Sequence, residues 1–344
     1  KFEDYNPAKK IISKHFKNTS EIKKNFTNTL KKISKDKILV LGEIIIDKYI
    51  YSEPLGKPSK EDILSVCVNK SESFLGGVIP VVKNIKQFNK NVSLVSIYNS
   101  ENIKKKLKNE LGNLKNINLI KAPGYKDVVK SRYISNGSTK IFETYDFANK
   151  EISSHLQGKI IKKFLKKFDH IIVCDFGHGL IDKKLASLIS KNSKFLSLNV
   201  QTNSGNRGYN LFTKYSNADL LCIDRGEIRL GIGDKFSTMK KLITDKKLKN
   251  FKNVVLTMGS DGHLLKRFKN KKIFEFPAMN QKVIDTIGAG DAFYSYLATF
   301  NRHSSNPVIL SLAGSIAGAL KTNILGHKSE IKIDNVLKSL IFLT

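Results

Sequence analysis

The sequence predicts an α/β fold in which a doubly wound, mostly parallel sheet carries a second, smaller sheet. Short apolar runs alternate with lysine-rich helical patterns, as expected for strands that are buried on both faces and connected through helices. Four further short strand patterns fall outside this alternation, and they predict a small sheet of their own. The predicted strands of the main sheet span residues 38–47, 92–97, 171–174, 195–199, 220–223 and 254–258.

The first 36 residues predict at least one amphipathic helix before the main fold begins. Apolar side chains recur there every three or four residues among lysines, at Ile22, Phe26, Leu30 and Ile33. Two interpretations stay open: a linker from an upstream domain, or an N-terminal helix that lies on this domain. The chain starts at Lys1 rather than at Met, which accords with a missing upstream part.

The first strand of the main sheet is predicted from a continuous apolar run over residues 38–47. The run ends at Asp47, and ligands of open α/β sheets bind near the carboxyl ends of the strands. Asp47 is therefore the first candidate for a substrate contact, with an ordinary strand-end aspartate as the alternative. Gly76 and Gly77 precede an apolar helical pattern that starts at Val78, so they predict a tight turn that opens a helix.

The small sheet is predicted from short strands that turn signals separate. A segment rich in Pro, Gly and Ser separates the first two strands, and Asn136-Gly137 between the last two is a hairpin signal. The predicted strands of the small sheet span residues 49–51, 63–68, 127–134 and 139–145.

Polar groups follow several other predicted strands. Residues 175–178 and residues 199–202 stand at two such strand ends. In the first of them, His178 could act as an acid or bind phosphate, whereas a histidine beside glycines is also common in turns. Residues 257–262 close a strand with a turn rich in donors and glycine, after which a hairpin starts.

The segment 283–293 concentrates small residues, two carboxylates and the opening of an apolar helix. Gly288, Ala289 and Gly290 have almost no side chain, so their amide N–H groups can approach a ligand closely. A helix start of this kind is an anion site. Asp291 lies in the first turn, where it either accepts a proton from a hydroxyl that attacks a phosphoryl group or caps the helix.

Length and composition suit a globular protein of this class. With 344 residues and 40% hydrophobic content, the chain can bury a large core. Its three cysteines lie apart in apolar, strand-like runs, which argues against a disulfide framework and favours a reducing cytosol. The longest mostly apolar run, residues 308–320, is shorter than the roughly 20 residues that a spanning helix needs. We therefore expect a cytoplasmic protein with no membrane partner.

The formal charge of +30 raises the hypothesis of a nucleic-acid-associated protein, because basic faces bind phosphate backbones. Two observations argue against it. Only six of the 60 basic residues are arginine, whose planar fork suits specific phosphate and base recognition. The lysines are also spread along the whole chain, which is typical of a solvated surface. No specific nucleic-acid partner is expected.

The segment 283–293 also resembles a known family. Its fixed positions match the signature Asp-Thr-x-Gly-Ala-Gly-Asp-x-Phe of the PfkB, or ribokinase-like, carbohydrate kinases at Asp285, Thr286, Gly288, Ala289, Gly290, Asp291 and Phe293. The resemblance covers about residues 37–330, and it implies a ribokinase-like kinase domain over residues 37–344 that uses ATP and Mg²⁺. It also implies that the small sheet, with strands at about 48–68 and 127–146, forms a lid over the sugar.

The resemblance implies roles for residues on the sugar side. Asp291 would be the base that activates the sugar hydroxyl, and the amides of the three small residues before it would form the anion hole. Residues that would bind the sugar lie at the first strand end, in the Gly-Gly turn and on the lid, where exposed lid-strand lysines are the alternative. They are Asp47, Gly76, Gly77, Lys57, Lys130 and Arg132.

The resemblance also implies contacts to the nucleotide, at Thr257, Gly259, Gly262, Thr286 and Asn323. Two departures from the family pattern stand out. Val78-Ile79-Pro80 replaces a region in which many members carry an Asn, so the acceptor is expected to be unusual. The family's Asn-x-x-Glu motif for magnesium and phosphates is altered, which leaves two candidate metal residues, Asp224 and Glu227.

Within the family, the chain looks most like the kinase domain of ADP-heptose synthases, through residues 42–49, residues 59–61 and the Gly-Gly turn. That resemblance implies ATP-dependent phosphorylation of a sugar or sugar phosphate, with the anomeric hydroxyl of heptose 7-phosphate as the specific hypothesis. A covalently linked or separate nucleotidyltransferase domain is the implied partner, and a homodimer is one option for the assembly. The alternative functions are a catalytically inactive sugar- or nucleotide-binding domain and, with less support, a basic nucleic-acid-associated protein.

Overall fold

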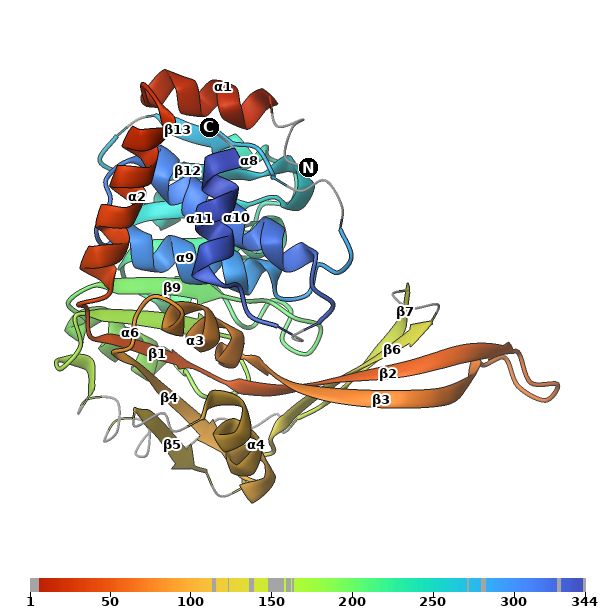
Figure 1. The fold of residues 1–344 in the computed structure, drawn as a ribbon. Helices are drawn as coiled ribbons and strands as arrows, with labels where there is room; N and C mark the ends of the chain where they lie inside the picture. Colours follow the sequence, from red (N-terminus) through yellow and green to blue (C-terminus); the bar gives the residue numbers. More distant parts are fainter. Residues whose placement is uncertain are drawn as a thin grey trace.

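Figure 1 shows an α/β core from which a narrow β-sheet projects to one side. The computed structural model describes residues 6–112, 116–122, 124–135, 139–147, 158, 162, 164–270, 272–279, 283–326 and 329–342. The predicted turn at Asn136-Gly137 lies outside these residues. The described residues form two sheets, as the sequence predicts.

The main sheet has nine strands among the described residues, in the order β13-β12-β11-β10-β9-β8-β1-β4-β5. Every neighbouring pair from β11 to β5 is parallel, whereas β12 and β13 add an antiparallel edge. The mostly parallel sheet predicted from the apolar runs is therefore confirmed. Its strands are β1 (Ile38–Gly42), β4 (Val92–Tyr98), β5 (Ile117–Lys121), β8 (His170–Asp175), β9 (Leu196–Val200), β10 (Ala218–Asp224), β11 (Phe251–Thr257), β12 (His263–Arg267) and β13 (Ile273–Phe276).

Helices cover both faces of this sheet. Helices α9 and α10 are apolar and buried along nearly their whole length, and they pack on each other, while α3 packs on α9 and on β1. Helix α7 packs on β10 and β11. The helices are α1 (Asn6–His15), α2 (Thr19–Ile33), α3 (Val78–Lys86), α4 (Glu101–Leu111), α6 (Lys183–Asn192), α7 (Arg225–Ile232), α8 (Met239–Leu242), α9 (Ala289–Asn301), α10 (Pro307–Thr322) and α11 (Ile333–Phe342).

The N-terminal helices pack against the core. The apolar stripe of α2 faces inward, and the ring of Phe26 lies 4.5 Å from the ring of Phe300 on α9. The side-chain amide of Asn89 donates to the carbonyls of Ile33 and Asp36, which fixes the chain where it enters β1. Burial of this stripe removes apolar surface from water and so favours the packed arrangement.

The projecting sheet has four strands in the order β3-β2-β6-β7, and we call it the lid sheet. One strand extends past its predicted end, over residues 52–56, and the next extends toward the core, over residues 69–77, because both stretches contain too few apolar residues to be recognised in the sequence. The strands are β2 (Ile44–Gly56), β3 (Ser65–Gly77), β6 (Val128–Ser135) and β7 (Thr139–Asp146).

The prediction of one strand over residues 38–47 is wrong, because the chain changes sheets at Glu43. Gly77 lies against this break with φ at 62°, and a Cβ added there would come within 2.4 Å of the carbonyl oxygen of Glu43. Asp47 therefore stands within β2 of the lid sheet, not at the end of a strand of the main sheet. No helix among the described residues has the length and apolar content that crossing a membrane requires.

Candidate active site

Two cavities meet at the N-terminus of α9. We call the first the hairpin cavity: it measures about 770 Å³ and lies between the β11–β12 turn, α9 and α10. The second, the lid cavity, measures about 200 Å³ and lies between the lid sheet, the ends of β8 and β9, and α9. Ala289 and Gly290 line the hairpin cavity, whereas Gly288 and Asp291 line the lid cavity. The signature segment therefore forms the boundary between the two.

The start of α9 is shaped for close approach by a ligand. Gly288 occupies the N-cap position with φ at 75°, in the left-handed region that favours glycine, and no side chain caps the helix. A Cβ added to Gly290 would meet no atom within 4 Å. Asp291 is the third residue of the helix, so it does not occupy the N-cap position. Such a helix start attracts anions through its amides and dipole.

Asp291 shares the lid cavity with Asp47, Lys130 and Arg132. Its Oδ1 atom accepts a hydrogen bond of 3.1 Å from the side-chain amide of Gln201, which follows β9. The sequence brings these residues from four separate elements, and parallel strands place their carboxyl ends at one edge of the sheet. A hydroxyl group held in this cavity would have a carboxylate beside it as proton acceptor.

Arg132 and Asp47 form a buried ion pair across neighbouring lid strands. Burial lowers the pKa of Arg132, but the adjacent Asp47 carboxylate outweighs that effect and the pKa is raised overall. Lys130 lies 3.6 Å from Glu143 and its ammonium stands 4.6 Å from the ring centroid of Tyr145. Burial, and then the charge of Arg132, lower the pKa of Lys130. Part of the positive charge in the cavity is therefore already neutralised.

Other residues predicted on the sugar side lie in different places. Gly77 lines the lid cavity, whereas Gly76 lies one residue earlier in β3, paired with Ile45 of β2. Lys57 lies in the exposed connection between β2 and β3 of the lid sheet and pairs with Asp62. It does not line the lid cavity, so the structure does not bring it to the other candidates. Its position follows from the length of β2, which the sequence pattern underestimates.

The residues predicted to contact a nucleotide gather at the hairpin cavity, with one exception. Thr257, Gly259, Gly262 and Thr286 line it. Gly262 has φ at 82°, and a Cβ there would stand 2.1 Å from the carbonyl oxygen of Phe276, so the tight turn requires glycine. Asn323 is exposed at the C-cap of α10, where its side chain bonds to the carbonyl of Ala319. Its neighbour Thr322 lines the cavity instead.

The two candidate metal residues form the capping box of α7. The Asp224 carboxylate accepts from the Glu227 amide at 2.8 Å, and the Glu227 carboxylate accepts from the amides of Asp224 and Thr202 at 2.7 and 3.1 Å. Burial, and then Asp224, raise the pKa of Glu227 to about 8. Glu227 thus uses its carboxyl oxygens to accept backbone hydrogen bonds, while Asp224 is exposed and lines the hairpin cavity.

The described residues contain no cluster of three metal-ligating side chains, and Mg²⁺ bound through nucleotide phosphates needs only one or two protein carboxylates. Asp224 fits that arrangement.

Several residues of the lid cavity had no assigned role in the sequence. Phe176, Gln201 and Asn203 reach it from the loops after β8 and β9, and Tyr145 reaches it from β7. His178, for which the sequence left a role as an acid or a phosphate ligand open, also lines this cavity. The strand-end position of residues 175–178 and 199–202 was the available signal. Burial, and then the charge of Lys130, lower the pKa of His178 to about 4, so this ring is neutral near pH 7.

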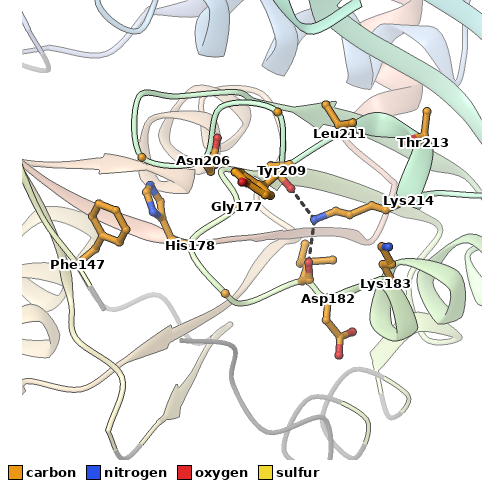
Figure 2. A pocket seen from close by; sticks show the side chains of 15 residues that line it. Phe147, Gly177, His178, Asp182, Lys183, Asn206, Tyr209, Leu211, Thr213 and Lys214 are labelled. Atoms are coloured by element: carbon orange, nitrogen blue, oxygen red, sulfur yellow. Dashed lines mark hydrogen bonds between the residues drawn. The ribbon is translucent and has the colours of Figure 1, made fainter. Parts of the chain in front are cut away.

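A third cavity of about 920 Å³ adjoins the lid cavity, and His178 lines both. Figure 2 shows His178 beside Phe147 at one end of this third cavity, with Lys214 at the other end. The Lys214 ammonium lies 2.6 Å from the buried Asp175 carboxylate and donates to the Asn210 side chain and the Ile181 carbonyl. Its charge is therefore compensated inside the protein.

Because of two buried carboxyl groups, we expect the stability of the folded protein to fall as pH rises above neutrality. Burial, followed by Asp175, raises the pKa of Glu43 to about 7, and the pKa of Glu227 is about 8. Both groups ionise near 4.5 when the chain unfolds, so the folded protein binds more protons at pH 7. Their contribution to stability is present at low pH and is lost as pH rises through 7 and 8.

We expect the free energy of unfolding to fall by on the order of 1 kcal/mol between about pH 7 and pH 8.5. Denaturant titrations at the two pH values measure it. The low pKa values of His178 and His263 act in the opposite direction, but only below about 6.5, their unfolded value. Glu227→Gln should remove most of the fall, and an equal fall in this variant would contradict the assignment.

The chain is similar to known carbohydrate kinases. The profile described as pfkB family carbohydrate kinase matches residues 35–317. Curated relatives named Bifunctional protein HldE include one from Campylobacter curvus, 27% identical over 271 residues, and one from Aliarcobacter butzleri, 25% identical over 273 residues. These alignments cover 76% and 77% of this chain and 56% of each relative. The chain thus spans little more than half the length of these relatives.

Solved structures with the same fold include ribokinases from two organisms. Ribokinase from Thermotoga maritima superimposes with a TM-score of 0.70 at 19% identity, over 89% of this chain and 99% of that protein. Arabidopsis thaliana ribokinase in complex with ribose and ATP gives a TM-score of 0.66 at 16% identity, over 90% and 98% of the two chains. The ribokinase-like fold is therefore confirmed.

Proposed function

The chain belongs to the pfkB family of carbohydrate kinases and is an ATP-dependent kinase, and we propose that it phosphorylates a sugar phosphate, heptose 7-phosphate, at the anomeric hydroxyl. The observation that carries the proposal is the position of the α9 start between two cavities. Asp291 faces the lid cavity, where the sugar would lie, and Gly290 faces the hairpin cavity, where ATP would lie.

In the proposed reaction, Asp291 accepts the proton of the attacking hydroxyl. The hydroxyl oxygen forms a bond to the γ-phosphorus as the bond from that phosphorus to the ADP oxygen breaks. The amides of residues 288–290 and the dipole of α9 stabilise the negative charge of the transferred group. Magnesium bound with the nucleotide would neutralise phosphate charge, and Asp224 is the carboxylate available to hold it.

The choice of a sugar phosphate is supported by Lys130. Arg132 is already paired with Asp47, and Lys57 lies outside the lid cavity, so these two residues cannot supply a free charge for a distal phosphate. Lys130 lines the cavity and pairs with Glu143 at 3.6 Å, a longer contact than the one between Arg132 and Asp47. The sequence resemblance to the kinase domain of ADP-heptose synthases and the relatives named Bifunctional protein HldE support the heptose.

A coupled ATP-consumption assay with matched free and phosphorylated sugars tests the acceptor. We expect kcat/KM to be higher for heptose 7-phosphate than for the free heptose. Lys130→Met should lower kcat/KM for the phosphorylated sugar by about 10-fold or more, as the loss of one charge-assisted contact predicts, and it should affect the free sugar less. Lys126→Met, which removes an exposed lysine paired with Asp146, is the matched control. Equal kcat/KM values for the two sugars would contradict the proposal.

The proposal includes a nucleotidyltransferase partner, covalently linked or separate, because the relatives are called bifunctional and extend well beyond the matched region.

The proposal also includes a homodimer formed through the lid sheet. Apolar side chains are exposed at the outer part of this sheet, at Leu55, Ile63, Leu64 and Val68, and such groups commonly mark interfaces. Sedimentation equilibrium should give twice the chain mass, and Leu64→Glu should lower it. A monomer at every concentration tested would exclude the dimer.

A further inference from the structure

We propose that Gln201 is a positioning residue that holds the Asp291 carboxylate ionised and aimed into the lid cavity. The inference rests on the proposed role of Asp291 as the base. It starts from a chain of three hydrogen bonds that links Asp291 to the main sheet. Gln201 donates from Nε2 to Asp291 Oδ1 at 3.1 Å and to Asn199 Oδ1 at 2.8 Å, and Asn199 donates from Nδ2 to the Cys222 carbonyl at 2.9 Å.

This chain of bonds determines which way each amide group faces. The Cys222 carbonyl can only accept, so Asn199 must present its NH₂ group to β10 and its oxygen to Gln201. That oxygen in turn requires the NH₂ group of Gln201, whose two hydrogens suffice for Asn199 and Asp291 together. Gln201 therefore offers a donor to Asp291, and the alternative with its oxygen against the carboxylate is excluded.

The backbone amide and carbonyl of Gln201 also form hydrogen bonds. Its amide donates to the Asp175 carbonyl at 2.8 Å, and its carbonyl accepts from the Asn210 side chain at 3.0 Å. Asn199 on β9 is buried. A side chain anchored on both sides keeps its hydrogen bond to Asp291 without losing further conformational entropy during the reaction.

The bond also affects the protonation of Asp291, because a donor stabilises the charged form of a carboxylate. Charged groups of the lid cavity and of the core surround the Asp291 carboxylate. The balance between its protonated and ionised forms is therefore sensitive to the loss of one hydrogen-bond donor. The charged or titratable residues of the lid cavity are Asp47, Lys130, Arg132, Tyr145 and His178, and the charge of Asp291 also acts on Glu227, Lys321 and Cys174. All eight stay in place when Gln201 alone is replaced.

The pH dependence of kcat/KM in Gln201 variants tests the proposal. Gln201→Leu removes the donor, so we expect kcat/KM to fall about 10- to 100-fold and the acidic limb of its pH profile to move to higher pH. Gln201→Glu keeps the size of the side chain and brings a second carboxylate to Asp291, so its acidic limb should move further, by about one pH unit. The dissociation constant for ATP should stay within about twofold, as expected when only base orientation changes.

Two comparisons separate positioning from other roles. Asn203→Ala changes a residue of the same cavity that bonds to the Phe176 carbonyl, so it should alter KM for the sugar without moving the acidic limb. In an Asp291→Asn background, Gln201→Leu should cause no further loss, because the two residues act as one unit. Acidic limbs at the parental position in both Gln201 variants, or an additive loss in the double variant, would overturn the proposal. If Asp291→Asn alone keeps the parental kcat, the proposed base fails instead, and the two failures are distinct.

Discussion

Replacing Asp291 with asparagine is expected to lower kcat by about 10²- to 10⁴-fold, the range typical of general base catalysis. The amide has the shape of the carboxylate and can still accept the hydrogen bond from Gln201, but it cannot take a proton from the acceptor hydroxyl. Asp291 is not the N-cap residue of α9, so stability should change by less than the roughly 0.5–2 kcal/mol that loss of a cap costs. Steady-state kinetics and calorimetric ATP binding measure the two effects.

Asp285→Asn is the matched control, since it lies in the same segment and has a different task. The Asp285 carboxylate accepts from the Gly326 amide at 2.9 Å and from the Ile287 amide at 3.0 Å. An asparagine can satisfy only one of these amides, so this variant should lose roughly 1–3 kcal/mol of stability. If Asp291→Asn keeps kcat within about threefold of the parent, far from the loss of a base, Asp291 has no role in proton transfer.

The parts of the site that the sequence predicts are those encoded locally. Gly288, Gly290 and Asp291 fall within one helical turn, where the spacing of small residues and the onset of apolar periodicity indicate a helix start. The turn at Gly259 and Gly262 is local in the same way, and its positive φ angles at 62° and 82° explain the glycines. Such features need no knowledge of tertiary contacts.

Other features depend on how distant segments pack and could not be predicted in the same way. The change of sheet at Glu43 lies between two short apolar runs, residues 38–41 and 44–46, and a single buried strand explains both runs equally well because the strands on both sides are buried. The pairing of Asp47 with Arg132 follows from the register of β2 and β6, which are 85 residues apart at this contact. Gln201 likewise has no local signal beyond its place after a strand.

Gly290→Ala is expected to weaken ATP binding while it stabilises the protein. Gly290 is the second residue of α9, it does not require a positive φ, and a Cβ there meets no protein atom within 4 Å. Alanine in a helix is favoured over glycine by up to about 1 kcal/mol. The same methyl group would enter the hairpin cavity where the proposed phosphates lie. Overpacking of that contact by about 1–3 kcal/mol corresponds to a roughly 5- to 150-fold rise in the dissociation constant.

Gly226→Ala provides the control because Gly226 is also the second residue of a helix, α7. The nearest atom to a Cβ there is Asp224 Oδ1 at 3.4 Å, and Gly226 does not line the hairpin cavity. Both variants should therefore gain stability in denaturant titrations, but only Gly290→Ala should lose ATP affinity in calorimetry. Parental ATP affinity in Gly290→Ala would show that the nucleotide phosphates do not approach the start of α9, and the anion hole would have to lie elsewhere.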